Sequence, residues 1–380
     1  MPYVRRDVRL PDFYDRDIAR LDEAGRRRAL TLPAGLDFSS NDYLALAGSP
    51  ELRAAAVAAL GRGVATGSGG SRLLRGNTAE HEALEEAAAR FFGAGSALYL
   101  GSGFTANSLL FSTLPQEGDL ILHDALVHAS AHEGMRLSRA SHQAFRHNDP
   151  GAAAQAIARW RDEGHRGTVW IAFETLYSMD GDVAPVADFA ALAERESAML
   201  IIDEAHSVGV CGPGGRGLAA GLHGRENVVV LATCGKALGC EGALLLATNA
   251  VREFLVNRGR SFIFSTAPSP LMAEIARASL GLVEAADERR ARLEGLVNTA
   301  AGVLAPLGIL ASGSHIQPVI IGEDARTMEV ASQLRKRGFD IRGIRPPSVP
   351  PGTARLRVSI TLNTDKSAIA ALRDALEELL

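Results

Sequence analysis

The segment Met199-Leu-Ile-Ile-Asp-Glu-Ala-His206 joins a short apolar run directly to two acidic residues and a histidine. An apolar run of this length is typical of a strand buried on both faces of a parallel sheet. Ligands bind where the carboxyl ends of such strands meet, so we expect Asp203 and His206 to lie at the edge of a site. Position alone also allows a plainer interpretation, in which both residues only cap the turn that follows the strand.

Similar apolar runs recur between about residues 50 and 260, where they alternate with helical patterns. This alternation predicts an α/β protein with a mostly parallel central sheet flanked by helices. A helical tract over 271–304 then leads to a smaller C-terminal α/β domain. We therefore expect an N-terminal arm over 1–45, a large domain over 46–270, and a linking helix with the small domain over 271–380. The predicted strands are 97–100, 120–122, 169–173, 199–203, 228–233, 243–247, 315–320 and 355–360.

Helix signals fit between these strands. Asn77-Thr-Ala-Glu80 reads as a capping box in front of a helix over 81–92. Further helices are predicted over 325–337, from residue 365 onward, and over 15–27 in the arm.

Composition narrows the class of protein. Of the 380 residues, 47% are hydrophobic and 22% are charged, and no apolar run reaches the length of a membrane span. A net charge of −4 is too balanced for binding nucleic acid or lipid through bulk charge, so we expect a small-molecule partner, no nucleic acid and no membrane. Three cysteines without a CxxC pair, and a first stretch (1–10) without the apolar core of a signal peptide, favour a cytoplasmic protein.

A lysine between glycines follows another apolar run, in Thr233-Cys-Gly-Lys-Ala-Leu-Gly239. Burial there would lower the pKa of Lys236, as Schiff-base chemistry with an aldehyde requires. Such a lysine is more often an ordinary loop residue when it stands alone. Lys236 together with Asp203 indicates a site for pyridoxal phosphate, because this cofactor needs an amine to bond to and a carboxylate that keeps its ring nitrogen protonated.

The segment Gly101-Ser-Gly-Phe-Thr-Ala106 joins a predicted strand to a helix, where backbone N–H groups can hold a phosphate. Its spacing also matches the GxGxxA dinucleotide turn, which leaves a nucleotide-binding protein as an alternative. No acid follows at the end of a second strand about 20 residues on, as that turn would need. The letters Asp203-Glu-Ala-His206 match a helicase box too, but the chain has no GxxxxGK[ST] loop.

Two further patterns carry polar side chains. His128 and His132 stand four residues apart and could bind zinc on a helix, but there is no HExxH motif, so we expect no metal. For His128 we favour an imidazole that lies flat against a cofactor ring. For His132 we favour a structural role. The stretch Ile344-Arg-Pro-Pro-Ser-Val-Pro350 is rigid, and an arginine on the adjoining strand could bind a carboxylate. Solvated loop arginines are the alternative there.

These motifs together resemble the pyridoxal-phosphate-dependent α-oxoamine synthases, acyl-thioester:amino-acid transferases of fold type I. The resemblance covers nearly the whole chain, and five motifs occur in the family's order. They are Ser39-Ser-Asn-Asp-Tyr-Leu44, Gly67-Ser-Gly-Gly-Ser71, Tyr177-Ser-Met-Asp-Gly-Asp182, Asp203-Glu-Ala-His206 and Gly235-Lys-Ala-Leu-Gly239.

By that resemblance Lys236 forms the covalent link to the cofactor, Asp203 pairs with the ring nitrogen, and His128 stacks on the ring. Ser178 and His206 would hydrogen-bond the ring oxygen. The residues implied for the phosphate are Ser102, Gly103, Phe104 and Thr233, with Ser265 and Thr266 reaching the phosphate of the neighbouring subunit of a homodimer.

The resemblance also implies substrates. Asn41 and Arg357 match positions around the amino-acid carboxylate, and we expect Arg345 to bind substrate too. The segment over 344–357 looks most like that of the members that condense L-alanine with a pimeloyl thioester. The alternative is another member with the same mechanism, such as glycine C-acetyltransferase or a synthase of long α-aminoketones.

Overall fold

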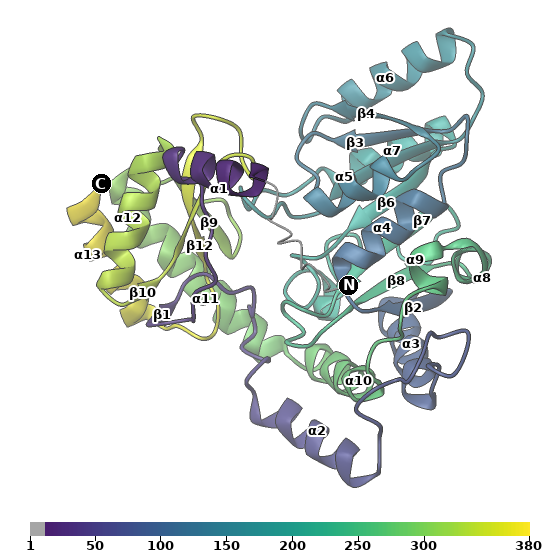
Figure 1. Ribbon diagram of the computed structural model, residues 1–380, viewed down its shortest axis with the longest axis horizontal. Helices are drawn as coiled ribbons and strands as arrows, with labels where there is room; N and C mark the ends of the chain where they lie inside the picture. Colours follow the sequence, from purple (N-terminus) through teal and green to yellow (C-terminus); the bar gives the residue numbers. More distant parts are fainter. Residues whose placement is uncertain (1–11) are drawn as a thin grey trace, which may run out of the picture.

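The computed structural model describes residues 12–380, and Figure 1 shows two lobes side by side. The larger lobe is built on a seven-stranded sheet in the order β2-β8-β7-β6-β5-β3-β4. β8 runs antiparallel to both of its neighbours, and the other pairs are parallel. The strands are β2 Ser96–Leu100, β3 Leu120–Asp124, β4 Ser141–Phe145, β5 Val169–Glu174, β6 Met199–Asp203, β7 Val228–Thr233 and β8 Ala243–Ala247. The mixed, mostly parallel sheet confirms the predicted α/β class.

Helices cover both faces of this sheet, because alternate strand residues point to opposite sides. One face packs against α4, α5, α8 and α9, and the other against α3, α6, α7 and α10. The helices are α3 Ala79–Phe92, α4 Gly103–Thr113, α5 Ala129–Arg136, α6 Pro150–Asp162, α7 Val186–Glu196, α8 Asn249–Arg258, α9 Arg260–Ile263 and α10 Pro270–Glu284. Burial on both faces explains why the central strands are apolar along their whole length.

The smaller lobe holds an antiparallel sheet in the order β11-β12-β9. Its strands are β9 Ile316–Gly322, β11 Arg342–Ile344 and β12 Ala354–Ser359, and its helices are α12 Asp324–Lys336 and α13 Lys366–Leu379. Leu356 and Val358 of β12 point into the core, so Arg355 and Arg357 share the opposite side of the strand. That side faces the larger lobe.

The N-terminal segment joins the smaller lobe rather than the larger one. β1 (Leu36–Asp37) pairs in parallel with β10 (Phe339–Asp340), and the Ser359 N–H donates to the Phe38 carbonyl at 2.9 Å. Before this strand lies α1 (Phe13–Glu23), and after it α2 (Pro50–Gly61) packs on α10. This course brings residues 38–44 between the lobes.

The linking tract is two helices, not the single helix expected over 271–304. α10 ends at Glu284 and α11 runs over Asp287–Leu304, where it packs on α13. Arg290 Nη1 donates to the Val283 carbonyl at 2.7 Å. This contact satisfies a carbonyl at the end of α10 and allows the chain to turn between the lobes.

Two local expectations were also wrong. α3 is capped by Thr78 with His81 as the reciprocal partner, because Asn77 is held by Arg72 and Glu82 instead. β4 was missed, since this edge strand is largely exposed and lacks an apolar run. Within residues 12–380 no helix is long and apolar enough to cross a membrane. The stretch 1–10, interpreted as lacking a signal peptide, lies wholly outside the described residues and is not tested.

Candidate active site

Functional side chains gather at the carboxyl edge of the large sheet, which we call the floor of the site. β6 ends at Asp203, β7 ends at Thr233, and Lys236 follows in the next turn. Ser102 follows β2, and His128 follows β3. Asp203, Thr233, Lys236 and His128 line one cavity of about 200 Å³. The structure therefore brings these strand-end residues together at one edge of the sheet.

Lys236 is half-buried in this cavity and faces an imidazole. Its Nζ lies 2.8 Å from His206 Nε2, and His206 Nδ1 lies 2.7 Å from the Tyr43 hydroxyl. Burial lowers the pKa of Lys236 to about 8. Burial, with the charges of Lys236 and Arg357 next, lowers the pKa of His206 well below its usual range. At neutral pH a neutral imidazole thus accompanies an amine that readily gives up its proton.

Asp203 is oriented by two donors. Asn107 Nδ2 donates to Asp203 Oδ2 at 3.1 Å, and the Ala205 N–H donates to Oδ1 at 2.9 Å. Asn107 also donates to the hydroxyl of Ser130 at 2.9 Å, beside the residue that caps α5. That cap is His128, whose Nδ1 accepts from the Ser130 N–H at 3.2 Å. The carboxylate and the imidazole are therefore held in one network.

The N-terminus of α4 closes another side of the same cavity. Ser102 is the N-cap, with its hydroxyl accepting from the Thr105 N–H at 3.1 Å, and Gly103 and Phe104 are the first two helical residues. Gly103, Phe104 and Thr233 all line the cavity. Free backbone N–H groups and the positive end of the helix dipole make this corner suitable for a phosphate.

Glu174 is a residue of the floor that sequence reasoning missed. It is the last residue of β5, is fully surrounded by protein, and lines the same cavity as Asp203. Burial and the neighbouring Asp203 charge raise the pKa of Glu174 well above its usual range. Among the described residues, its Oε1 has no hydrogen-bond partner. The sequence does contain a signal for Glu174, because this acid directly follows an apolar run, as Asp203 does.

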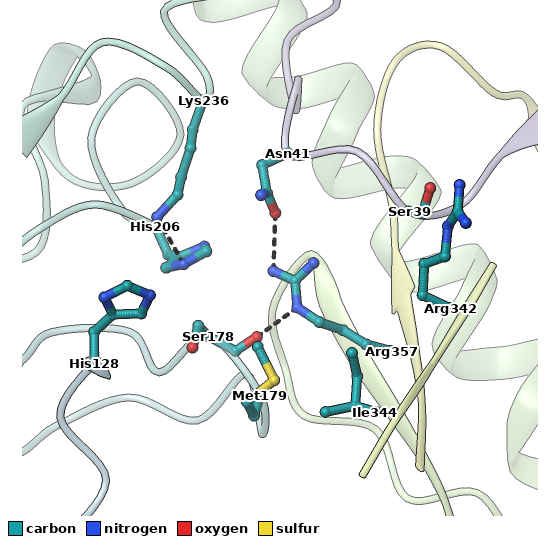
Figure 2. Close-up of a pocket in the computed structure, with 10 residues that line it drawn as sticks. All are labelled: Ser39, Asn41, His128, Ser178, Met179, His206, Lys236, Arg342, Ile344 and Arg357. Carbon is teal, nitrogen blue, oxygen red and sulfur yellow. Dashed lines mark hydrogen bonds between the residues drawn. The ribbon is translucent and has the colours of Figure 1, made fainter. Parts of the chain in front are cut away.

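A second group of residues, which we call the rim, comes mostly from the smaller lobe and the N-terminal segment (Figure 2). Arg357 Nη2 donates to Asn41 Oδ1 at 3.0 Å, and Arg357 Nε donates to the Ser178 carbonyl at 2.5 Å. These three residues line a cavity of about 240 Å³ together with Lys236 and His206. The guanidinium and the lysine amine therefore face one space from opposite lobes.

Arg345 is not brought to this space. Its Nη1 contacts Met328 Sδ and its Nη2 reaches the Arg27 carbonyl at 3.4 Å. Arg342, on β11, lines the rim cavity instead and pairs with Asp340 at 2.9 Å. β11 ends at Ile344, so Arg345 leaves the strand and turns toward the arm.

Ser265 and Thr266 lie in the loop between α9 and α10, and neither lines the floor cavity of its own subunit. Thr266 pairs with Ser71, and Ser265 lines an open hollow beside Phe104. Apolar side chains are exposed around them, with Leu74 82%, Phe264 71% and Phe104 52% accessible. Exposed apolar groups concentrated in this way mark a surface suited to another protein chain.

The floor has the groups that pyridoxal phosphate requires. A lysine of lowered pKa suits the aldehyde, a carboxylate at the base suits the ring nitrogen, and the start of α4 suits the phosphate. The unpartnered Glu174 oxygen shows that the cavity is built for a polar guest. The residues present therefore fit the group. Among the described residues, no cluster of three or more His, Cys, Asp or Glu side chains could hold a metal ion.

Comparisons with known proteins agree with this geometry. Residues 33–376 match the model of the aminotransferase class I and II family. The 8-amino-7-oxononanoate synthase of Chromobacterium violaceum is 41% identical over 376 residues, covering 94% of this chain and 96% of the relative. That of Burkholderia cenocepacia is 40% identical over 394 residues, covering 97% and 95%.

Solved structures give the same result. A serine palmitoyltransferase from S. paucimobilis with PLP bound superposes with a TM-score of 0.87 at 26% identity, covering 97% of this chain and 96% of the other. The 8-amino-7-oxononanoate synthase of Francisella tularensis superposes with a TM-score of 0.75 at 26% identity, covering 90% and 98%. Both likenesses extend over both lobes.

Proposed function

The chain belongs to the class I and II aminotransferase family, close to its 8-amino-7-oxononanoate synthases, and from this premise we propose how its own residues act. The enzyme condenses L-alanine with a pimeloyl thioester and releases carbon dioxide and the free thiol of coenzyme A or a carrier protein. The product is 8-amino-7-oxononanoate, on the route to biotin. One observation carries the proposal: Lys236 and Arg357 line the same cavity, so an amino acid held by its carboxylate at the rim meets the lysine at the floor.

Pyridoxal phosphate is the cofactor, and when bound it supplies an electron sink for the carbanion at the amino acid's α-carbon. Lys236 would hold it covalently, and Asp203 would pair with its ring nitrogen. His128 would lie against the ring, while Ser178 and His206 would hydrogen-bond the ring oxygen. The phosphate would bind to Ser102, Gly103, Phe104 and Thr233.

Proton transfer is assigned to the buried amine. With its lowered pKa, the Lys236 amine is available to take the α-proton of alanine and later to return one to the same carbon. Asn107 and the Ala205 N–H hold the Asp203 carboxyl group at the base of the cavity, where it would face the ring nitrogen of the cofactor. His128, whose pKa is lowered mainly by burial, is placed to assist proton transfer near the acyl oxygen.

Arg357 selects which bond reacts. A guanidinium can hold a carboxylate through two parallel hydrogen bonds, and this orientation decides which bond of the α-carbon is broken. Asn41 and the Ser178 carbonyl fix the guanidinium from two sides. Because the partners of Arg357 come from both lobes, the carboxylate site depends on how the lobes are packed.

We further propose that the enzyme works as a homodimer in the cytoplasm. Ser265 and Thr266 of the partner subunit would complete the phosphate site, and the exposed Phe104, Phe264 and Leu74 beside these positions support an interface there. Cys211, Cys234 and Cys240 are free thiols, as expected in a reducing compartment.

A product assay tests the function. Alanine, glycine and serine are each offered with pimeloyl and with acetyl thioesters, and products are identified by mass spectrometry. We expect 8-amino-7-oxononanoate from alanine and pimeloyl thioester as the dominant product. Preference for glycine with the acetyl thioester would instead indicate a glycine C-acetyltransferase. A visible absorbance band that disappears with borohydride, in a protein that binds no NAD, separates both from a nucleotide-binding protein.

A further inference from the structure

A third cavity, which we call the acyl groove, adjoins the rim. It has a volume of about 510 Å³ and is lined by three segments of the chain, residues 125–127 with Ala129 and His132, residues 177–180, and residues 346–351. Ser178 and Met179 line both the acyl groove and the rim cavity, so the two spaces share a wall. Alanine, leucine, valine and proline side chains dominate the groove. Such a lining suits a chain of methylene groups.

His132 is a polar side chain in this apolar lining. It lies on α5, one helical turn beyond His128, which is about 6 Å along the helix axis. Residues four apart share one face of a helix. His128 lines the floor and rim cavities, whereas His132 lines the acyl groove. With the thioester reacting beside His128, as proposed above, His132 stands one helical turn away, a distance comparable with a short acyl chain.

The two acidic side chains nearest His132, Glu133 and Asp180, are each paired with an arginine, so they repel an anion less than free carboxylates would. Arg136 on the same helix pairs with Glu133, while the imidazoles of His123 and His142 lie behind, the first with its ring centroid 5.1 Å from that of His132. Asp180, the acid in the groove, is already paired with Arg355. The His132 ring meets the His123 ring edge-on, and Ser348 is another polar side chain that lines the groove.

We propose that His132 binds the distal carboxylate of the acyl donor and thereby selects a dicarboxylic acyl chain over a monocarboxylic chain of equal length. This inference rests on the proposed function, because it assumes that the acyl group occupies the groove. A carboxylate at His132 replaces lost hydration with a charge-assisted hydrogen bond. An unsubstituted chain end would leave the imidazole without a partner.

The test compares pimeloyl and heptanoyl thioesters of the same carrier, with L-alanine and the cofactor-loaded enzyme. In His132→Leu we expect kcat/KM for the pimeloyl thioester to fall about ten- to a hundredfold, the scale of one charged hydrogen bond, and kcat/KM for the heptanoyl thioester to stay within about threefold. His132→Gln, which keeps a neutral donor, should fall between. The matched control His142→Gln removes an imidazole of the same cluster outside the groove and should leave the ratio unchanged.

A second measurement needs no turnover. Pimeloyl- and heptanoyl-pantetheine are titrated into the loaded enzyme without alanine, by calorimetry. The wild type should bind the pimeloyl form more tightly, and His132→Leu should remove most of that preference. An unchanged preference in both experiments overturns the role of His132. If the wild type makes no product from either thioester, the proposed function is wrong instead. The difference in affinity measured by calorimetry then still decides whether His132 binds a carboxylate.

Discussion

The floor and the rim of the site differ in how many parts of the chain each needs. Floor residues follow strands of one sheet, so Asp203, Thr233 and Lys236 are aligned by the same parallel register that builds the core. The rim depends on Arg357 of the smaller lobe, Asn41 of the N-terminal segment and Ser178 of the larger lobe. This difference indicates that the chemistry rests on a rigid sheet edge, while substrate choice rests on contacts between lobes.

The sharpest test of the floor is Lys236→Ala. Loss of the covalent catalyst should slow turnover at least about a thousandfold, while the fold is retained because the lysine is not part of a packed apolar cluster. Turnover and circular dichroism are measured together. Near-normal turnover would end the assignment of Lys236.

Asp203→Asn removes one charge from the floor while keeping the shape. Without the charge at the base, the carbanion is less stabilised, so exchange of the α-proton of alanine should slow by about a hundredfold or more. Exchange of the α-deuteron is followed by NMR. An unchanged exchange rate would show that another group, with Glu174 the nearest candidate, carries this role.

The rim is tested by Arg357→Leu against its neighbour Arg355→Leu. Losing a charged hydrogen-bond pair should raise the alanine concentration needed for saturation about ten- to several-hundredfold, with the visible band of the bound cofactor unchanged. Arg355 pairs with Asp180 instead, so its variant should shift saturation much less. A larger shift for Arg355→Leu would mean that the carboxylate anchor is assigned to the wrong arginine.

A pH series sharpens the contrast further. Burial lowers the pKa of Lys236 from 10.5 to about 8, so its amine becomes neutral as pH rises through about 8. The neutral fraction increases from roughly 10% at pH 7 to roughly 90% at pH 9, which predicts about a tenfold faster reaction of the cofactor-free chain with an aldehyde. Lys236→Ala should lack this step. A midpoint near 10.5 would show a solvated lysine.

The smallest effect is expected at Thr266, in the loop between α9 and α10. Thr266→Val removes a hydroxyl that does not line the floor cavity of its own subunit, so in the proposed dimer it acts on the cofactor of the neighbouring subunit. We expect cofactor affinity to fall about three- to tenfold, the scale of one neutral hydrogen bond, measured by equilibrium dialysis. Sedimentation of a fully active monomer at assay concentration would contradict this prediction.

More residues of the floor than of the rim could be predicted from the sequence. Asp203 and Lys236 stand directly behind apolar runs, and register in a parallel sheet carries such residues to one edge. Glu174 obeys the same rule and could have been found by applying it to every strand. The sequence does not show whether Arg342 or Arg345 faces the rim cavity. The residue at which β11 ends decides this, and the end of β11 depends on contacts of both arginines with the N-terminal arm. The pairing of β1 with β10 has no local signal at all.

That pairing bears on how the chain is assembled during synthesis. Leu36 leaves the ribosome about 300 residues before Gly338, whose carbonyl accepts its N–H. At ~5–20 residues per second, this interval lasts ~15–60 s, and the strands of the larger lobe are complete before it ends. Phe38, fully buried in the finished protein, lacks for that time the Phe339 ring, whose centroid lies 6.2 Å from its own. The larger lobe, with the residues proposed to bind the cofactor, is thus synthesised first. Asn41 can contact Arg357 only after the C-terminal part of the chain has left the ribosome, so the carboxylate site forms last.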